Sequence, residues 1–136
     1  MTTTEAAGNS ARVGPVQIGV ILLALATAGI HLSVFLIEGF LGDGSMFPIF
    51  QFLFIGNFLG YITLALALYF VAPLARFRPV IRALTISIAV ASIFSYFDVN
   101  VRDTVGDVDK IIEVALIVLL AVDAFISAAK GEPARR

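Results

Sequence analysis

Hydrophobic residues in this chain fall into long runs without charge, and short polar segments separate the runs. Residues 13–37 form a run of 25 residues with no charged side chain, and residues 44–75 form another of 32. A helix needs about 20 apolar residues to cross the hydrocarbon core of a bilayer. The two runs therefore predict transmembrane helices over about residues 15–37 and 47–72.

Two further runs are shorter or carry a few charges. Residues 83–97 are free of charge, with Arg82 placed to extend its side chain toward the membrane interface, and residues 111–129 contain only two acids. They predict helices over about residues 79–97 and 109–129. The alternative is two crossings with an amphipathic pair of helices on the membrane surface. We favour four crossings, which predicts an all-α integral membrane four-helix bundle of up-down-up-down topology over residues 13–130.

The two ends of the chain differ from this pattern. Residues 1–12 are small and polar, which predicts a disordered tail, and residues 131–136 predict a short basic tail. The first apolar run is much longer than the 7–15 apolar residues of a signal peptide, so we interpret it as a retained anchor.

Composition supports a membrane location. The chain is 60% hydrophobic and 14% charged, whereas soluble domains have roughly 45–50% apolar and about 25% charged residues. A net charge of −1 without a basic stripe argues against a nucleic-acid partner, and the absence of cysteine excludes disulfides and thiolate sites. Membrane lipid is the expected surrounding partner.

The basic residues predict the orientation. Four crossings place seven of the nine lysines and arginines on one side of the membrane, and the positive-inside rule makes that side cytoplasmic. We therefore expect a cell-membrane protein with both termini in the cytoplasm. The seven residues are Arg12, Arg76, Arg78, Arg82, Lys130, Arg135 and Arg136, and the two on the other side are Arg102 and Lys110.

His31 is the only histidine in the chain, and it lies within the first predicted helix. Ionisable groups inside a bilayer are costly and point to function, so His31 predicts either a proton- or ligand-binding residue or a neutral histidine bonded to a neighbouring helix. Antiparallel geometry brings other polar residues to the same half of the bundle. The candidates for this ligand- or proton-binding site are His31, Glu38, Asn57, Tyr61, Tyr96, Asp98 and Glu113.

These residues allow two interpretations. They could form a carboxylate-rich vestibule that takes up protons or a cation, or an ordinary solvated rim in which Lys110 pairs with Glu113 at a spacing of three residues. In the other half of the bundle, Arg82 and Asp123 could form an ion pair between helices. Gly56 and Gly60 form a small-xxx-small pair that predicts a close helix contact.

Enzyme signatures are absent from the sequence, so we expect no catalytic residues, no cofactor and no metal site. A haem held between two copies through His31 is an alternative, since one chain supplies only one histidine.

Residues 28–32 (AGIHL) and 108–116 (VDKIIEVAL) resemble a family of small four-helix membrane proteins of unknown function, frequent in haloarchaea and present in some bacteria. This resemblance implies a four-helix integral membrane protein and no established activity.

Two functions follow from these observations. One is a non-enzymatic accessory or self-associating subunit, whose partner would be a second copy or another membrane protein. The alternative is a small-molecule, lipid, quinone, proton or ion site around His31 and Glu38.

Overall fold

The structure, a computed structural model, describes residues 13–131, and in them the prediction of an all-α four-helix bundle is confirmed. The tails predicted over residues 1–12 and 132–136 lie outside the described residues. The elements are α1 (Pro15–Val34), the π-helical turn η1 (Phe35–Phe40), α2 (Pro48–Tyr69), the 3₁₀ turn η2 (Ala72–Phe77), α3 (Arg78–Val99) and α4 (Thr104–Gly131).

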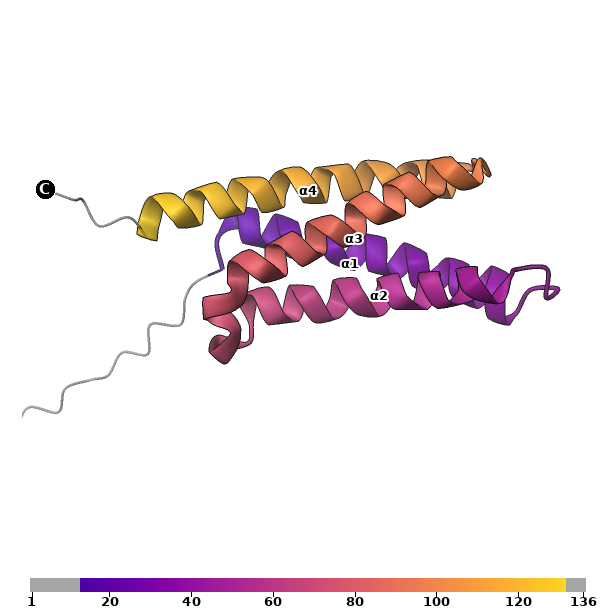
Figure 1. The fold of residues 1–136 in the computed structure, drawn as a ribbon, viewed down its shortest axis with the longest axis horizontal. Coiled ribbons are helices and arrows are strands. Elements are labelled where there is room, and N and C mark those ends of the chain that lie inside the picture. Colours follow the sequence, from indigo (N-terminus) through magenta and orange to yellow (C-terminus); the bar gives the residue numbers. More distant parts are fainter. Residues whose placement is uncertain (1–12, 132–136) are drawn as a thin grey trace, which may run out of the picture.

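The four helices run antiparallel to their neighbours along one long axis (Figure 1). Helix α1 packs against α2 and α4, and α3 packs against the same two helices, so α1 lies diagonally across from α3. We call the end where α1 begins and α4 finishes the terminal end. The opposite end, which holds the connections at residues 41–47 and 100–103, is the distal end.

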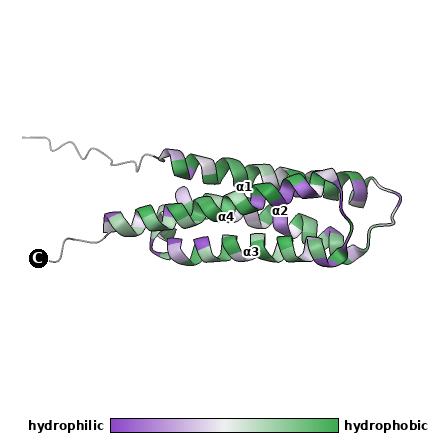
Figure 2. Cartoon of the chain, turned by 90° about the horizontal axis from the view of Figure 1, so that it is seen from above, coloured by the Kyte–Doolittle hydropathy of each residue, from purple (hydrophilic) through white to green (hydrophobic). Residues whose placement is uncertain are grey.

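Four helical segments are long and apolar enough to cross a membrane: Pro15–Phe40, Pro48–Tyr69, Ala72–Val99 and Thr104–Gly131. Apolar residues predominate along all four (Figure 2), and many large ones are exposed on the outside of the bundle. Phe52, Phe94 and Phe125 are 72–77% exposed, which a water-soluble bundle would not tolerate at such density. The chain is therefore a multi-pass membrane protein.

The interior is unusually polar for so apolar a chain. Ten hydrophobic residues are buried among the described residues, together with eight polar or charged ones. Small residues, including Ala24 and Ala28 on α1 and Ala89 on α3, allow the helices to approach closely. Lipid replaces water outside, so the polar side chains are concentrated at the helix contacts.

Helix α4 begins at Thr104, five residues before the predicted start. Asp103 caps it, because its carboxylate accepts the Gly106 backbone N–H at 2.6 Å. Asn100 ends α3 in the left-handed conformation, with φ of 56°, and the connection between the two helices is only residues 100–103. Residues 104–108, which lie between the predicted helices 79–97 and 109–129, are thus the first turns of α4.

The first membrane segment is longer than predicted, because α1 continues into η1 as far as Phe40. The chain then turns so tightly that a Cβ atom at Gly42 would lie 2.1 Å from the Glu38 carbonyl oxygen. Only glycine fits there without moving the backbone.

Candidate functional site

A buried polar network lies toward the distal end, and all four helices contribute to it. We call it the distal cluster. Its members are Thr27 and His31 on α1, Asn57 and Tyr61 on α2, Ser92 on α3, and Asp109, Lys110 and Glu113 on α4.

Lys110 holds the centre of the cluster. Its Nζ atom lies 2.9 Å from Asp109 Oδ2 and 2.6 Å from Glu113 Oε2, and it donates to Ser92 Oγ at 2.6 Å. Two of the three ammonium hydrogens are engaged in hydrogen bonds to Ser92 and Glu113, and Asp109 is held by the ion pair. The lysine therefore contacts both carboxylates of the cluster as a cation.

The two carboxylates are surrounded by donors. Tyr61 donates its hydroxyl proton to Glu113 Oε1 at 2.8 Å, and Thr27 donates to Asp109 Oδ1 at 2.6 Å. Lys110 donates to Glu113 Oε2 and forms an ion pair with Asp109 Oδ2. Because each of the four carboxylate oxygens lies next to a donor or a cation, the contacts fit the ionised form of both groups.

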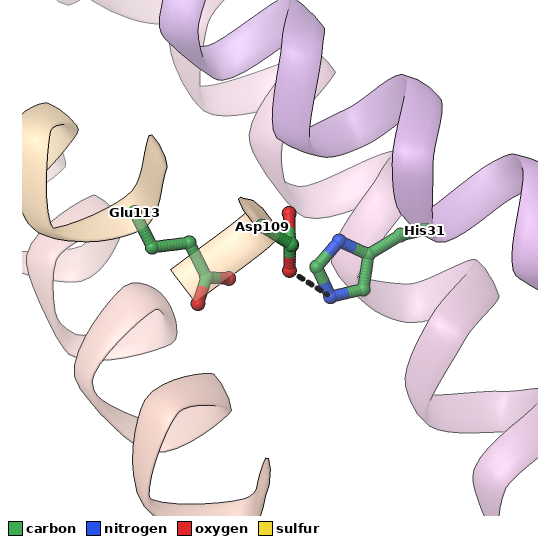
Figure 3. A group of neighbouring side chains, drawn as sticks. All are labelled: His31, Asp109 and Glu113. Carbon is green, nitrogen blue, oxygen red and sulfur yellow. Dashed lines mark ion pairs between the residues drawn. The ribbon is translucent and has the colours of Figure 1, made fainter. Parts of the chain in front are cut away.

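His31 is described best as a neutral imidazole. Its Nδ1 atom lies 2.9 Å from the Thr27 carbonyl oxygen, which can only accept, so Nδ1 carries the proton. Nε2 then accepts a hydrogen bond from the Asn57 amide at 3.1 Å and lies 3.5 Å from Ser92 Oγ. The same atom lies 3.8 Å from Asp109 Oδ2, the pair marked in Figure 3.

This arrangement leaves the distal cluster with an unbalanced charge. With Asp109 and Glu113 ionised, Lys110 protonated and His31 neutral, the formal net charge is −1. His31, Asp109 and Glu113 are at most 3% exposed. An uncompensated buried charge costs several kcal/mol, so the cluster favours uptake of one positive charge. A proton on His31 Nε2 would lie directly against Asp109.

The same side chains could be considered for a metal. Ligand atoms of His31, Asp109 and Glu113 lie within 4.8 Å of one another, and the three point to a common centre (Figure 3). One imidazole and two carboxylates suit a divalent transition metal. However, the Lys110 ammonium already contacts both carboxylates, and a metal would have to displace it. The charge imbalance therefore fits a proton better than a divalent cation.

A second buried polar network, the terminal cluster, lies toward the other end. Asp123 accepts hydrogen bonds from Gln17 at 3.2 Å, Tyr69 at 3.0 Å and Arg82 at 2.8 Å, so it too joins all four helices. Arg82 also donates to Ser127 at 2.8 Å. Its one cation balances its one carboxylate, so this cluster is neutral.

Apolar packing separates the two clusters. Between Glu113 and Asp123, the buried residues of α4 are Leu116 and Leu120. They pack in one hydrophobic core with Ala24 and other apolar side chains. No hydrogen-bonded chain of described residues connects the distal cluster to the terminal one.

Four of the seven residues that sequence reasoning named for the site come together: His31, Asn57, Tyr61 and Glu113. Glu38 lies exposed in η1 and Asp98 lies exposed near the end of α3, both outside the cluster. Tyr96 lies at the edge of the distal cluster, next to Lys110. Its hydroxyl bonds to Asp107 at 3.0 Å, and Lys110 Nζ lies 5.7 Å from its ring.

Sequence reasoning did not include Thr27, Ser92 or Asp109 among the site candidates. Asp109 precedes Glu113 by four residues, which places both on one helix face, so this spacing could have indicated it. Nothing in the sequence distinguishes Ser92 from the other helix serines. Lys110 was expected to pair with Glu113 on a solvated rim; the pair is present, but Glu113 is fully buried.

The glycine pair on α2 divides between two environments. A Cβ atom at Gly60 would lie 3.2 Å from Ile88 of α3, so this glycine lies in a helix contact. A Cβ atom at Gly56 would meet nothing within 4 Å. Only one of the two therefore packs against another helix of the same chain.

Comparisons of the chain with protein families, with curated proteins and with solved structures find no match. The functional argument therefore depends on the geometry of the two clusters.

Proposed function

We propose that this chain is a proton-binding membrane protein in which His31 takes up one proton at the distal cluster. The observation that carries the proposal is that two buried carboxylates share one lysine, while Nε2 of His31 lies 3.8 Å from Asp109 Oδ2. With both acids ionised and His31 neutral, the cluster carries a formal charge of −1. One proton on Nε2 makes the cluster neutral. It also places opposite charges next to each other where water does not screen them.

Protonation changes the helix that His31 bonds to. The neutral imidazole accepts a hydrogen bond from Asn57 on α2 at 3.1 Å. A protonated Nε2 can only donate, so the Asn57 N–H must turn away and Asp109 on α4 becomes the preferred partner. Proton uptake thus exchanges a contact with α2 for a contact with α4, and the activity is a switch in helix packing. We assign no enzymatic reaction to the chain.

The contacts around Lys110 supply a route for the proton. Lys110 is 9% exposed, more than any other ionisable member of the cluster, and its Nζ donates to Ser92 Oγ at 2.6 Å. Ser92 Oγ lies 3.5 Å from His31 Nε2. Lys110 can pass a proton to Ser92 while the hydroxyl proton of Ser92 moves to His31. Lys110 then regains a proton from water at the distal end.

Because the chain has one histidine, labelling with ¹⁵N-histidine yields the signals of a single imidazole. In lipid nanodiscs, we expect the wild-type imidazole to change from the Nδ1–H tautomer to imidazolium as the pH falls. A pH-indicator dye should count one more proton taken up per chain by the wild type than by His31→Gln over this interval.

Two acid substitutions supply the matched comparison. Asp109→Asn removes the excess negative charge, so the imidazole should stay neutral over the interval in which the wild type is protonated. Asp98→Asn changes an exposed acid outside the cluster and should leave the wild-type behaviour intact. An imidazole in one charge state throughout the folded range, or equal proton uptake by the wild type and His31→Gln, would contradict the proposal.

The same proposal includes the orientation of the bundle in a cell membrane. The terminal end faces the cytoplasm, and the proton reaches the distal cluster from outside the cell. The support for this orientation is the placement of Arg76, Arg78, Arg82 and Lys130 at the terminal end. Of the two basic residues at the distal end, Arg102 pairs with Asp107 at 3.2 Å, and Lys110 lies within the cluster. The chain has no cysteine, so single cysteines at positions 45 and 75 can be tested with an impermeant thiol reagent. We expect labelling of position 45 alone from outside intact cells.

A self-associating role is a second proposal, and the open surface at Gly56 favours it. A glycine that nothing covers leaves a flat position where a helix of a second copy can approach. Gly56→Leu should then reduce chemical crosslinking between chains in nanodiscs, whereas Leu59→Ala at another exposed α2 position should not. Equal crosslinking by both variants would argue for an isolated chain.

A further inference from the structure

A groove lies between α3 and α4 at the terminal end, outside the distal cluster. It has a volume of about 440 Å³ and opens toward the surface of the bundle, where lipid lies. Its lining residues are Pro79, Arg82, Ala83, Ile86, Ala124, Ser127 and Ala128. Most of these side chains are small, so the two helices leave a furrow that none of their own residues fills.

Among the described residues, Arg82 is the one cationic residue that lines this groove. Arg82 is only 8% exposed, and its Nε and Nη2 atoms donate to Asp123 and Ser127. Its Nη1 atom makes no hydrogen bond to any residue between 13 and 131, yet no buried polar side-chain atom there lacks a partner. Nη1 therefore remains accessible, at the base of an otherwise apolar groove.

Apart from the Arg82–Asp123 pair, the charged side chains that the structure describes at this end are all basic. Arg76, Arg78 and Lys130 lie at the same end of the bundle, and Asp123, which Arg82 neutralises, is the only acid among the described residues there. Arg82 is the fifth residue of α3, about 6 Å along the helix from its start. This depth suits the boundary between headgroups and hydrocarbon, where basic residues attract anionic lipids.

We propose that this groove binds one anionic phospholipid, with its phosphate near Arg82 and the neighbouring basic residues and an acyl chain along Ile86. The lateral opening favours a lipid over a dissolved anion, because a chain leaving the groove enters the bilayer directly. The positive surroundings favour an anionic headgroup over a zwitterionic one. The site is independent of the protonation of His31.

Ala128→Leu tests the proposal by filling the groove from an exposed position, and Ala129→Leu is the matched control outside the groove. Phosphatidylglycerol or phosphatidylcholine is added to protein in detergent micelles, and bound lipid is counted by native mass spectrometry. We expect the wild type and Ala129→Leu to retain phosphatidylglycerol about fivefold more than phosphatidylcholine, and Ala128→Leu to lose this preference.

The same lipids should also act on stability. Phosphatidylglycerol should raise the unfolding midpoint of the wild type and Ala129→Leu, whereas Ala128→Leu should unfold at the wild-type midpoint without lipid and show no such rise. Equal retention of the two lipids, or an undiminished preference in Ala128→Leu, would overturn the proposal. An equal rise with inorganic phosphate would also overturn it, since it would indicate an ion site without lipid selectivity.

Discussion

Replacing Lys110 by methionine removes the only cation of the distal cluster and leaves Asp109 and Glu113 buried together. Removing one partner of a buried ion pair typically costs about 3–5 kcal/mol, because the remaining charge keeps its desolvation penalty. Here two carboxylates remain, and the net charge of the cluster becomes −2. We therefore expect Lys110→Met to lose at least about 3 kcal/mol of unfolding free energy and to take up a second proton when folded.

A second substitution separates charge from packing. Glu113→Gln alone removes a charge-assisted contact with Lys110, a loss of about 1.5–3 kcal/mol. In the double variant, Lys110→Met with Glu113→Gln, the net charge of the cluster is again −1, as in the wild type. The glutamine oxygen can still accept the hydrogen bond from Tyr61. The double variant should therefore be less destabilised than the sum of the single variants, by about 2 kcal/mol or more.

The assay is reversible unfolding in mixed micelles with increasing sodium dodecyl sulfate, followed by far-UV circular dichroism. Arg82→Met with Asp123→Asn forms a parallel cycle in the neutral terminal cluster, where proton uptake should stay unchanged in the double variant. If the losses of unfolding free energy in Lys110→Met and Glu113→Gln simply add in the double variant, the reasoning is refuted. Additivity would mean that the charges of Lys110 and Glu113 do not interact inside the bundle.

Three other predictions address single contacts. Tyr61→Phe removes one hydrogen bond to buried Glu113 and should lower the unfolding free energy by about 0.6–1.7 kcal/mol in the same assay, with a larger loss pointing to a rearranged cluster. Gly106→Ala would place a Cβ atom 2.4 Å from the Tyr96 ring, so the ring must move. This variant should lose about 1–3 kcal/mol, and unchanged NMR shifts of Tyr96 would contradict the contact. In the loop at the distal end, hydrogen bonds from Ser45 hold the pKa of Asp43 below its usual value. This turn is therefore stabilised above the ordinary carboxyl pKa and loosens as the pH falls through the lowered one, which amide hydrogen exchange should detect in the wild type and not in Asp43→Ala.

Much of the fold could be predicted because the bilayer imposes a minimum length on each apolar run. The number and order of the helices follow directly from those runs. The start of α4 did not follow, because residues 98–110 contain several charges and indicate a polar connection. In the structure, Asp103 caps the helix, and the inner face of the next turns carries Asp109, Lys110 and Glu113. Charges that bond to one another inside the bundle have the same sequence pattern as charges exposed to water.

The site could be predicted only in part, for a similar reason. The free-energy cost of placing polar side chains inside a membrane indicated four of the site residues, His31, Asn57, Tyr61 and Glu113. Whether they meet depends on how each helix is rotated about its axis, and hydrophobic runs that face lipid on most sides specify rotation weakly. Glu38 was assigned to the site with His31, but it lies exposed in the π-helical turn η1, outside the cluster.

The two clusters differ in the one property that decides what each can do. Both join all four helices and so fix their rotation. The terminal cluster pairs one cation with one carboxylate and contains no histidine, which suits a fixed structural contact. The distal cluster, with both acids ionised, has a formal charge of −1. Nε2 of its histidine lies between an amide on α2 and a carboxylate on α4. Leu116 and Leu120 separate the two, so a proton bound at the distal end finds no hydrogen-bonded path to the other side among residues 13–131. Such a proton enters and leaves on one side, which favours a switch in helix packing over a proton channel.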